Sequence, residues 1–187
     1  MPEPRPSLEQ MLAALKRQAG SSDKALPPVD KWNPAQCGEI GMEILADGTW
    51  RHEGTPIARE SLVPLFASIL RKDADGETYL ITPVEKVRVH VADAPFTAIR
   101  ADRAGEGADQ TIVFTTNVGD VVPLDADHPL RITHTANDEP RPYILIRGRL
   151  EARILRAPFY DLAQWSEARD GSCGVWSGGA WWALEAS

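Results

Sequence analysis

Short segments of alternating apolar and polar residues, separated by turn residues, run through the second half of this chain and constrain its fold most. Gly, Pro, Asp and Asn bound these segments, a pattern that is typical of β-strands joined by short connections. The predicted strands of this region are residues 95–101, 110–117, 120–124 and 130–135. We therefore expect this half to be mainly β-sheet.

The clearest alternation in the chain lies in residues 142–155. The even-numbered positions are mostly apolar, whereas the odd-numbered positions include Arg147, Arg149 and Arg153. Because successive side chains of a strand point to opposite faces, we expect one strand with an apolar face and an arginine face. Residues 157–169 then predict a helix.

The first half mixes strands with two predicted helices. Residues 7–20 begin with a Ser-x-x-Gln capping box and place apolar side chains on one face, which predicts a helix. A Pro-rich connector follows over residues 21–34, and we expect Trp32 to anchor it to the body of the protein. The apolar stripe of residues 56–72 predicts the main helix of this half, and residues 73–91 predict one or two strands.

An Asp-Gly dipeptide predicts a β-hairpin over residues 41–54. A two-residue loop would place Glu43 opposite His52 on one face of the sheet. Glu53 is next to His52 in the sequence but would point to the opposite face. A Glu43–His52 pair could orient an imidazole for acid–base chemistry, but the chain has no GxSxG motif and no cysteine beside a matching base.

Each half runs strands first and then a helix, an order that suggests duplication although no residue-level self-similarity is visible. This pattern predicts an α+β fold with two small related subdomains, each an antiparallel sheet with a packed helix. The expected parts are an N-terminal helix with its connector, a first and a second α+β subdomain, and a Trp-rich tail. They span residues 1–34, 35–87, 88–170 and 171–187.

The tail is unusual because four of the six tryptophans lie from Trp165 onward. Its Gly-Gly dipeptide could form a tight hairpin that pairs Trp176 with Trp181. The alternative is an extension that becomes ordered only at a subunit contact. In that case the tail would serve a homodimer or the docking of a partner.

Composition and charge narrow the function classes. The 187 residues carry a formal net charge of −7, which argues against wrapping of an extended nucleic-acid duplex. The two cysteines form no CxxC pair, the histidine spacing matches no metal motif, and no phosphate-binding glycine loop is present, so we expect neither metal nor cofactor. The lack of a signal pattern and of an apolar run near ~18 residues predicts a cytoplasmic protein without a membrane span.

Motifs in order along residues 27–160 resemble a bacterial family known as domain of unknown function 1285; among them are DGTWRHEGTPI, YLITPVEKVRVHVADAPF and RPYILIRGRLEARILR. The resemblance implies a two-part α+β protein of related repeats, with a pleckstrin-homology-like second half. It also implies a site for a nucleotide-like ligand between the halves and a signalling role, and it supplies no catalytic residues. Because TPVEKV lies at the junction of the halves, Thr82, Glu85 and Lys86 become candidate site residues.

Three functions remain open. The leading hypothesis is a non-enzymatic binding or sensing protein, with a small anionic or nucleotide-like ligand between its halves. Lysine and arginine would meet the anion, while an aromatic ring or imidazole would stack on the ligand or hydrogen-bond to it. The candidate residues are Trp50, His52, Thr82, Glu85, Lys86, Arg147, Arg149 and Arg153. The second hypothesis is a structural or interaction protein that dimerises or docks a partner through the Trp-rich tail, and the third is a hydrolase-like enzyme that uses Glu43 and His52.

Overall fold

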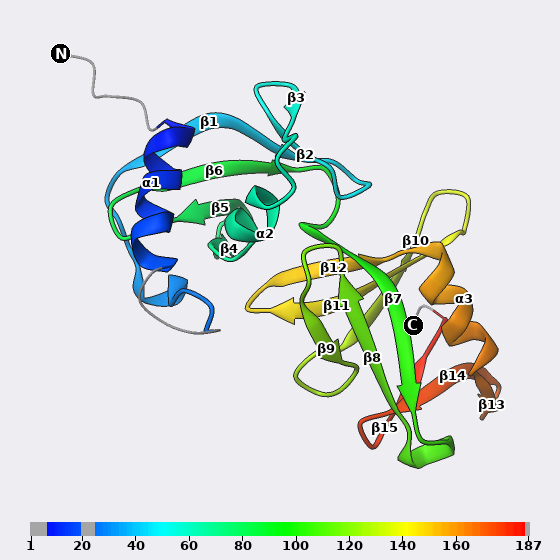
Figure 1. Cartoon of the computed structure of the whole chain (residues 1–187). Helices are drawn as coiled ribbons and strands as arrows, with labels where there is room; N and C mark the ends of the chain where they lie inside the picture. The colour runs from blue at the N-terminus through cyan, green and yellow to red at the C-terminus, as the bar shows by residue number, and fades with distance from the viewer. Residues whose placement is uncertain (1–6, 20–24, 186–187) are drawn as a thin grey trace. The chain divides into compact units, whose positions relative to one another are not determined.

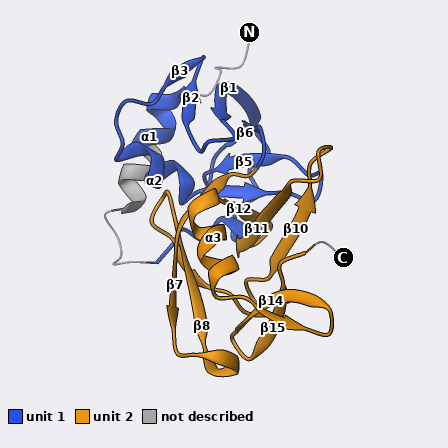
Figure 2. Ribbon diagram, turned by 90° about the vertical axis from the view of Figure 1, so that its right-hand side faces the viewer, with its two compact units in different colours: residues 1–93 blue, residues 94–187 orange. Residues whose placement is uncertain are grey.

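The computed structural model of the protein describes residues 7–19 and 25–185 (Figure 1). The chain forms two compact units, of which unit 1 spans Met1–Asp93 and unit 2 spans Ala94–Ser187 (Figure 2). Strands make up most of the regular structure, and helices are few. The expected two-part architecture is therefore confirmed, with more sheet than helix in both parts.

Unit 1 is built on a six-stranded sheet in the order β3-β2-β1-β6-β5-β4. Neighbouring strands are antiparallel except for β1 and β6, which are parallel. The strands are β1 (Cys37–Ile44), β2 (Trp50–His52), β3 (Thr55–Pro56), β4 (Leu70–Lys72), β5 (Thr78–Ile81) and β6 (Lys86–Val91). The unit also contains the helices α1 (Leu8–Ala19) and α2 (Leu62–Ala67) and the 3-10 helix η1 (Val29–Lys31).

Unit 2 has a second six-stranded sheet, in the order β10-β11-β12-β7-β8-β9. Its strands are β7 (Phe96–Ala104), β8 (Thr111–Thr116), β9 (Val121–Pro123), β10 (Leu130–His134), β11 (Pro140–Arg147) and β12 (Leu150–Ile154). Helix α3 (Arg156–Gln164) follows β12, and the 3-10 helix η2 (Gly107–Asp109) connects β7 to β8. A small antiparallel sheet ends the unit, with strands β13 (Glu167–Arg169), β14 (Ser172–Ser177) and β15 (Ala180–Ala183).

The two six-stranded sheets have the same strand order. In each, three consecutive strands run outward from the centre, three more return from the other edge, and the sixth strand pairs parallel with the first. The expectation of wholly antiparallel sheets is therefore wrong at this one pair in each unit, because the chain crosses over between its two meanders. The helices differ: α2 precedes the fourth strand of unit 1, whereas α3 follows the sixth strand of unit 2.

Equivalent strands of the two sheets also carry matching residues. In unit 1, Arg71, Tyr79 and Arg88 are direct neighbours across β4, β5 and β6. The row at the same register of β10, β11 and β12 in unit 2 consists of Arg131, Tyr143 and Arg153. Both tyrosines are 6% exposed, and a cationic side chain lies over each ring. This Arg-Tyr-Arg row is a residue-level repeat that the linear sequence did not reveal.

Strand alternation and helix capping behave as expected in unit 1. Val87 and Val89 of β6 are buried, whereas His90 is exposed. The capping box of α1 forms, with a hydrogen bond of 3.2 Å in each direction, and Met11 is fully buried. This helix therefore packs on its own chain. Residue 20, where the helix was expected to end, lies outside the described residues.

The helix predicted over residues 56–72 is wrong beyond a short central part. Leu62–Ala67 is helical, but Leu70–Lys72 forms strand β4. A turn begins at Asp73 and folds β4 back onto β5, which buries Leu70 in the sheet. Short apolar runs are compatible with either a helix or a strand, and here the turn that begins at Asp73 favours the strand.

The Asp-Gly hairpin forms, but its predicted register is wrong by one residue. The loop has three residues instead of two, because its glycine takes a φ of +88° and closes a bulge. His52 therefore lies opposite Met42, and Glu43 lies opposite Arg51. A shift of one residue moves a side chain to the other face, so the predicted Glu43–His52 pair does not form.

The single strand predicted over residues 142–155 is a hairpin of β11 and β12. Gly148, with a φ of +53°, lies in its turn, between Arg147 and Arg149. Arg153 lies farther along β12. The predicted arginine stripe is therefore wrong. The sequence pattern does not reveal the turn, because Gly148 occupies one position of an otherwise regular alternation of apolar and polar residues.

The Trp-rich tail is folded and belongs to unit 2. Trp176 and Trp181 pair across β14 and β15, with ring centroids 5.5 Å apart, which confirms the predicted hairpin. The Gln110 side chain donates to the Trp176 carbonyl oxygen at 2.7 Å, and the Ile112 N–H donates to the Ser177 hydroxyl at 2.9 Å. These bonds hold the tail on its own unit, so the alternative of an extension ordered only at a subunit contact is wrong.

Candidate functional site

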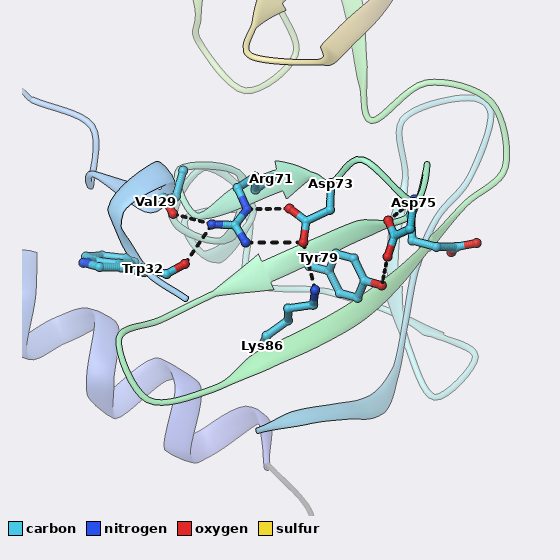
Figure 3. A network of polar contacts seen from close by, with 8 residues as sticks. Val29, Trp32, Arg71, Asp73, Asp75, Tyr79 and Lys86 are labelled. Carbon is cyan, nitrogen blue, oxygen red and sulfur yellow. Dashed lines mark hydrogen bonds and ion pairs between the residues drawn. The ribbon is translucent and has the colours of Figure 1, made fainter. Parts of the chain in front are cut away.

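A network of polar contacts in unit 1 centres on Arg71 of β4 (Figure 3). Its Nη1 donates to the carbonyl oxygens of Val29 and Trp32, at 2.7 and 2.8 Å. Its Nε and Nη2 donate to the two carboxylate oxygens of Asp73, at 2.5 and 3.3 Å. One guanidinium group thus ties the connector to the sheet. The connector is anchored at Trp32 through its backbone carbonyl oxygen, and this bond does not test the expectation that the tryptophan side chain is the anchor.

Lys86 and Tyr79 extend this network along β5 and β6. The Lys86 Nζ lies 2.8 Å from a carboxylate oxygen of Asp73 and 3.9 Å from the centroid of the Tyr79 ring. The Tyr79 hydroxyl donates to Asp75 at 2.8 Å, and this bond together with burial raises the pKa of Tyr79 to about 12. The hydrogen bond from Arg71 lowers the pKa of Asp73. The network therefore holds Asp73 ionised between two cations.

Both cations of this network already have partners. An incoming anion would have to break the ion pair between Lys86 and Asp73 before it could use the ammonium group. Separating this half-buried pair would leave Asp73 with Arg71 as its remaining ion-pair partner among the described residues, and losing a charge partner at a half-buried site is costly. The contacts of Lys86, a candidate site residue from the sequence, therefore indicate a structural role that links β6 to the end of β4.

Thr82 and Glu85 close the turn between β5 and β6, inside unit 1. The Thr82 N–H donates to the Glu85 carbonyl oxygen at 2.9 Å, and the Glu85 N–H donates to the Thr82 hydroxyl at 3.1 Å. Both residues are buried, with exposures of 1% and 7%. The Glu85 carboxylate makes no hydrogen bond or ion pair with any residue that the structure describes, and burial raises its pKa.

Trp50 and His52 lie on the inner face of the unit 1 sheet. Trp50 is 2% exposed, and its ring stacks on Phe66 with the centroids 6.3 Å apart. Its indole N–H has no hydrogen-bond partner among the described residues. His52 is half-buried opposite Met42. Trp50 is therefore part of the unit 1 core and offers no exposed ring for a ligand.

The three arginines of the β11–β12 hairpin have different surroundings. Arg147 is ion-paired with Asp120 at 2.8 Å and lies over the Phe96 ring, 5.0 Å from its centroid. Arg149 is exposed at the turn. Arg153 lies toward the other end of β12. The structure thus separates the three predicted anion ligands, and of the three Arg153 lines the pocket described next.

A pocket of about 450 Å³ lies in unit 2, where β11 begins, β12 ends and α3 begins. Its lining combines cationic, aromatic, apolar and acidic side chains, among them Arg153, Arg156, Phe159, Tyr160, Pro142 and Glu139. The Arg156 Nε donates to the Tyr160 hydroxyl at 2.8 Å. A cavity with two guanidinium groups beside aromatic rings suits a small anion with an apolar body.

Sequence reasoning selected Arg153 but missed Arg156, Phe159 and Tyr160. These three residues lie in the first half of α3, and the predicted helix was considered only for the face that it buries. The sequence signal that could have identified this pocket is the pair of arginines, Arg153 and Arg156, on the two sides of a strand-to-helix junction. Backbone N–H groups at the start of a helix have no partner within the helix and carry partial positive charge. Arginine side chains at the same point add to this positive charge, so the junction attracts an anion.

A second pocket, of about 370 Å³, lies on the polar face of unit 1. Glu43 and His90 are neighbours in the register of β1 and β6, and both line it. Arg88 in the same pocket is ion-paired with two glutamates. None of the described residues that line it is a serine, threonine or cysteine, so this acid–imidazole neighbourhood offers no side-chain nucleophile.

The described part of the chain holds no group of three or more His, Cys, Asp or Glu side chains arranged to bind a metal ion. Within the same residues, no helix has the length and apolar character needed to cross a membrane.

Sequence comparison identifies two adjoining family domains. The profile described as "Domain of unknown function (DUF1285), N-terminal domain" matches residues 27–94. The profile described as "Protein of unknown function (DUF1285), C-terminal domain" matches residues 95–184. No curated protein matches the chain significantly. The boundary between the two profiles follows residue 94, beside the division between units 1 and 2.

Two solved structures are similar to this chain. The crystal structure of a DUF1285 family protein from Silicibacter pomeroyi DSS-3 has 42% sequence identity, covers 92% of this chain and 94% of its own, and gives a TM-score of 0.82. A DUF1285 family protein from Shewanella baltica OS155 has 30% identity, covers 67% of this chain and 91% of its own, and gives a TM-score of 0.52. The resemblance carried by the motifs is confirmed, and the chain belongs to the DUF1285 family.

Proposed function

We propose that the protein is a non-enzymatic binding module for a small anionic molecule, held in the pocket of unit 2 between β12 and α3. The observation that carries this proposal is the presence of Arg153 and Arg156 in one cavity of about 450 Å³, together with Phe159 and Tyr160. Two guanidinium groups can give charge-assisted hydrogen bonds to a carboxylate or phosphate. The aromatic rings provide apolar contact for the rest of the ligand.

The start of α3 supports the same ligand chemistry. Leu155 at the N-cap makes no side-chain capping bond, and Arg156 is the first helical residue. The partial positive charge of a helix N-terminus falls off within the first turn, and this is the turn that meets the pocket. The helix terminus and the arginines therefore favour the same sign of ligand charge.

The broader expectations from the sequence stay within this proposal: a small anionic or nucleotide-like ligand, a signalling role and a cytoplasmic location. We favour the unit 2 pocket over a site that uses Lys86, because Lys86 is already ion-paired with Asp73. The pleckstrin-homology-like character of the second half also remains a proposal. It is supported by the order of unit 2, in which six sheet strands are followed by helix α3.

Titration with three anions tests this function: inorganic phosphate, adenosine monophosphate and phenylacetate, each followed by thermal shift and calorimetry. We expect at least one of them to raise the melting temperature saturably, and Arg156→Gln to weaken its binding by about tenfold or more. Arg149→Gln is the matched control, because it removes an exposed arginine outside the pocket. No binding of any of the three anions, or equal losses in the two variants, would contradict the proposal.

The Trp-rich sheet supports a second candidate function, interaction with a partner or a second copy. Trp176, Trp181 and Trp182 are half-exposed although the tail is folded. Arg169 lies over the first two rings, at 4.9 and 5.8 Å from their centroids. Solution mass across a concentration series tests this function: a dimer that dissociates in Trp176→Ala supports it, and monomers in both proteins contradict it.

A further inference from the structure

Strand β10 forms one edge of the unit 2 sheet and is the longest edge strand of the two six-stranded sheets (Figure 2). The other edge strands, β3, β4 and β9, have two or three residues, whereas β10 has five. Proteins protect sheet edges from unwanted pairing with proline, lysine, β-bulges or a covering segment. Pro56 lies in β3, Pro123 lies in β9, and the connector packs against β4. Strand β10 has no proline or lysine and pairs with β11 without a bulge, so its edge can accept a further strand.

The register of β10 and β11 determines which backbone groups of β10 face outward. In an antiparallel pair, residues that bond to the neighbouring strand alternate with residues whose N–H and C=O groups point away from it. Ile132 lies opposite Pro142, which has no N–H, and the bond from the Thr135 N–H to the Glu139 carbonyl oxygen follows the same alternation. Among the described residues, none is hydrogen-bonded to the outward groups. The residues with outward groups are Leu130, Ile132 and His134.

The side chains along this edge differ between the two faces of the sheet. Leu130 and Ile132 are half-buried on one face. On the other face, Thr133 lies opposite Arg141. The Arg141 guanidinium is half-buried and forms no hydrogen bond or ion pair with any residue that the structure describes. Because Thr133 is small, the long Arg141 side chain can reach past it, so an added strand would meet apolar groups on one face and a cation on the other.

We propose that the β10 edge binds an extended partner peptide in which apolar and acidic residues alternate. The peptide pairs antiparallel with β10, the more stable of the two pairings, and bonds to its outward backbone groups. Apolar side chains of the peptide lie beside Leu130 and Ile132. An acidic side chain opposite Thr133 meets the Arg141 guanidinium. This surface is distinct from the small-anion pocket, so the inference goes beyond the proposed function and does not depend on it.

A second copy of the chain fits this edge less well than an acidic peptide. Two β10 strands that use all their outward groups pair around Ile132, which places the second copy's Arg131 opposite Thr133. This arrangement brings a second cation toward Arg141, and like charges at neighbouring positions of a sheet are destabilising. The charges therefore favour a partner strand with an acidic residue at that position.

Titration of isotope-labelled protein with peptides, followed by NMR, tests the proposal. The capped peptide SVEVEVES should bind saturably with a Kd of about 1 mM or lower and shift the amide signals of Leu130, Ile132 and His134. The peptide SVKVKVKS should bind at least about fivefold more weakly, because its lysines meet Arg141. In antiparallel pairing the valines of SVEVEVES turn their N–H groups toward β10, so N-methylation of the valines should abolish binding, whereas N-methylation of the glutamates should not.

Two variants test the protein side of the interaction. Ile132→Pro removes an outward N–H and leaves the bonds to β11 in place, so it should weaken binding about fivefold or more, whereas the control Ile132→Val keeps the N–H and should bind normally. Arg141→Gln should weaken binding about threefold, and its control Arg149→Gln should have no effect. Circular dichroism checks the fold, and the N-methylated peptides decide the question even if Ile132→Pro does not fold.

Several results would overturn the inference. They are the absence of saturable binding by SVEVEVES, equal affinity for SVKVKVKS, and unchanged binding after N-methylation of the valines. Shifts of the same β10 amides with protein concentration, in the absence of peptide, would show that a second copy occupies the edge and would overturn it as well.

Discussion

Replacing Arg71 with alanine removes the group that ties the connector to β4. The side chain is 16% exposed and donates to two carbonyl oxygens, those of Val29 and Trp32. A hydrogen bond that involves a charged group contributes about 1.5–3 kcal/mol net. Asp73 keeps its ion pair with Lys86, so its charge stays compensated. We therefore expect a loss of about 3 kcal/mol, the lower end of the sum for two such bonds.

Native-state hydrogen exchange localises this loss to the connector. A loss of about 3 kcal/mol in the opening free energy speeds exchange of the backbone amides near residues 29–32 by roughly 100-fold. Arg88→Ala is the matched control, because Arg88 belongs to the same Arg-Tyr-Arg row but its ion pairs lie at side chains that are 45% exposed or more. Exposed pairs contribute little, so the control should change connector exchange hardly at all.

Unchanged connector exchange in Arg71→Ala would show that the two carbonyl bonds do not anchor the connector. Equal acceleration in Arg71→Ala and Arg88→Ala would point to a general effect of lost charge and would refute the same reasoning. Denaturant unfolding monitored in parallel shows whether the loss is local or extends to unit 1, since a chain of two units need not unfold in one step.

Two further substitutions probe the buried carboxylate and the tail. Burial raises the pKa of Glu85 above 4.5, so the contribution of this side chain to stability is complete below that value and is lost as pH rises through the raised pKa. Glu85→Gln should remove this loss of stability, which thermal melts between about pH 4 and pH 8 measure. A variant with the same pH profile as the unchanged protein would contradict this prediction. Gly174→Ala would place a Cβ 2.6 Å from the Trp182 carbonyl oxygen and 2.7 Å from the Trp181 ring. It should cost about 1–3 kcal/mol of stability in melts followed by tryptophan fluorescence, whereas a neutral effect would show that both the ring and the β15 backbone give way at no cost.

Sequence patterns predicted most strands of this protein because alternation is a local property of the chain. Turn geometry was harder to predict from the sequence. One extra loop residue at Gly48 shifted the hairpin register and separated Glu43 from His52. Gly148 likewise hid a turn within a regular alternation. In both cases a single glycine conformation decides which side chains share a face, and residue spacing alone does not encode it.

The candidate site was predictable in its charge but not in its place. Arg153 was selected as part of a stripe, yet its pocket depends on where β12 ends and α3 begins. Lys86 was selected by its position in a motif, but its partner Asp73 follows β4, which the sequence predicted to be helical. Contacts between elements decide these roles, and such contacts cannot be inferred from periodicity.

Binding of a small anion between Arg153 and Arg156 can be observed at the guanidinium groups themselves. The Nε–H resonances of the arginine side chains can be followed by NMR in isotope-labelled protein during titration with phenylacetate. We predict that the Arg153 and Arg156 signals shift together and saturate with one affinity, while the Arg149 signal stays in place. Shifts that grow without saturation across all arginines, or saturating shifts that leave both pocket arginines unmoved, would contradict an anion site in unit 2.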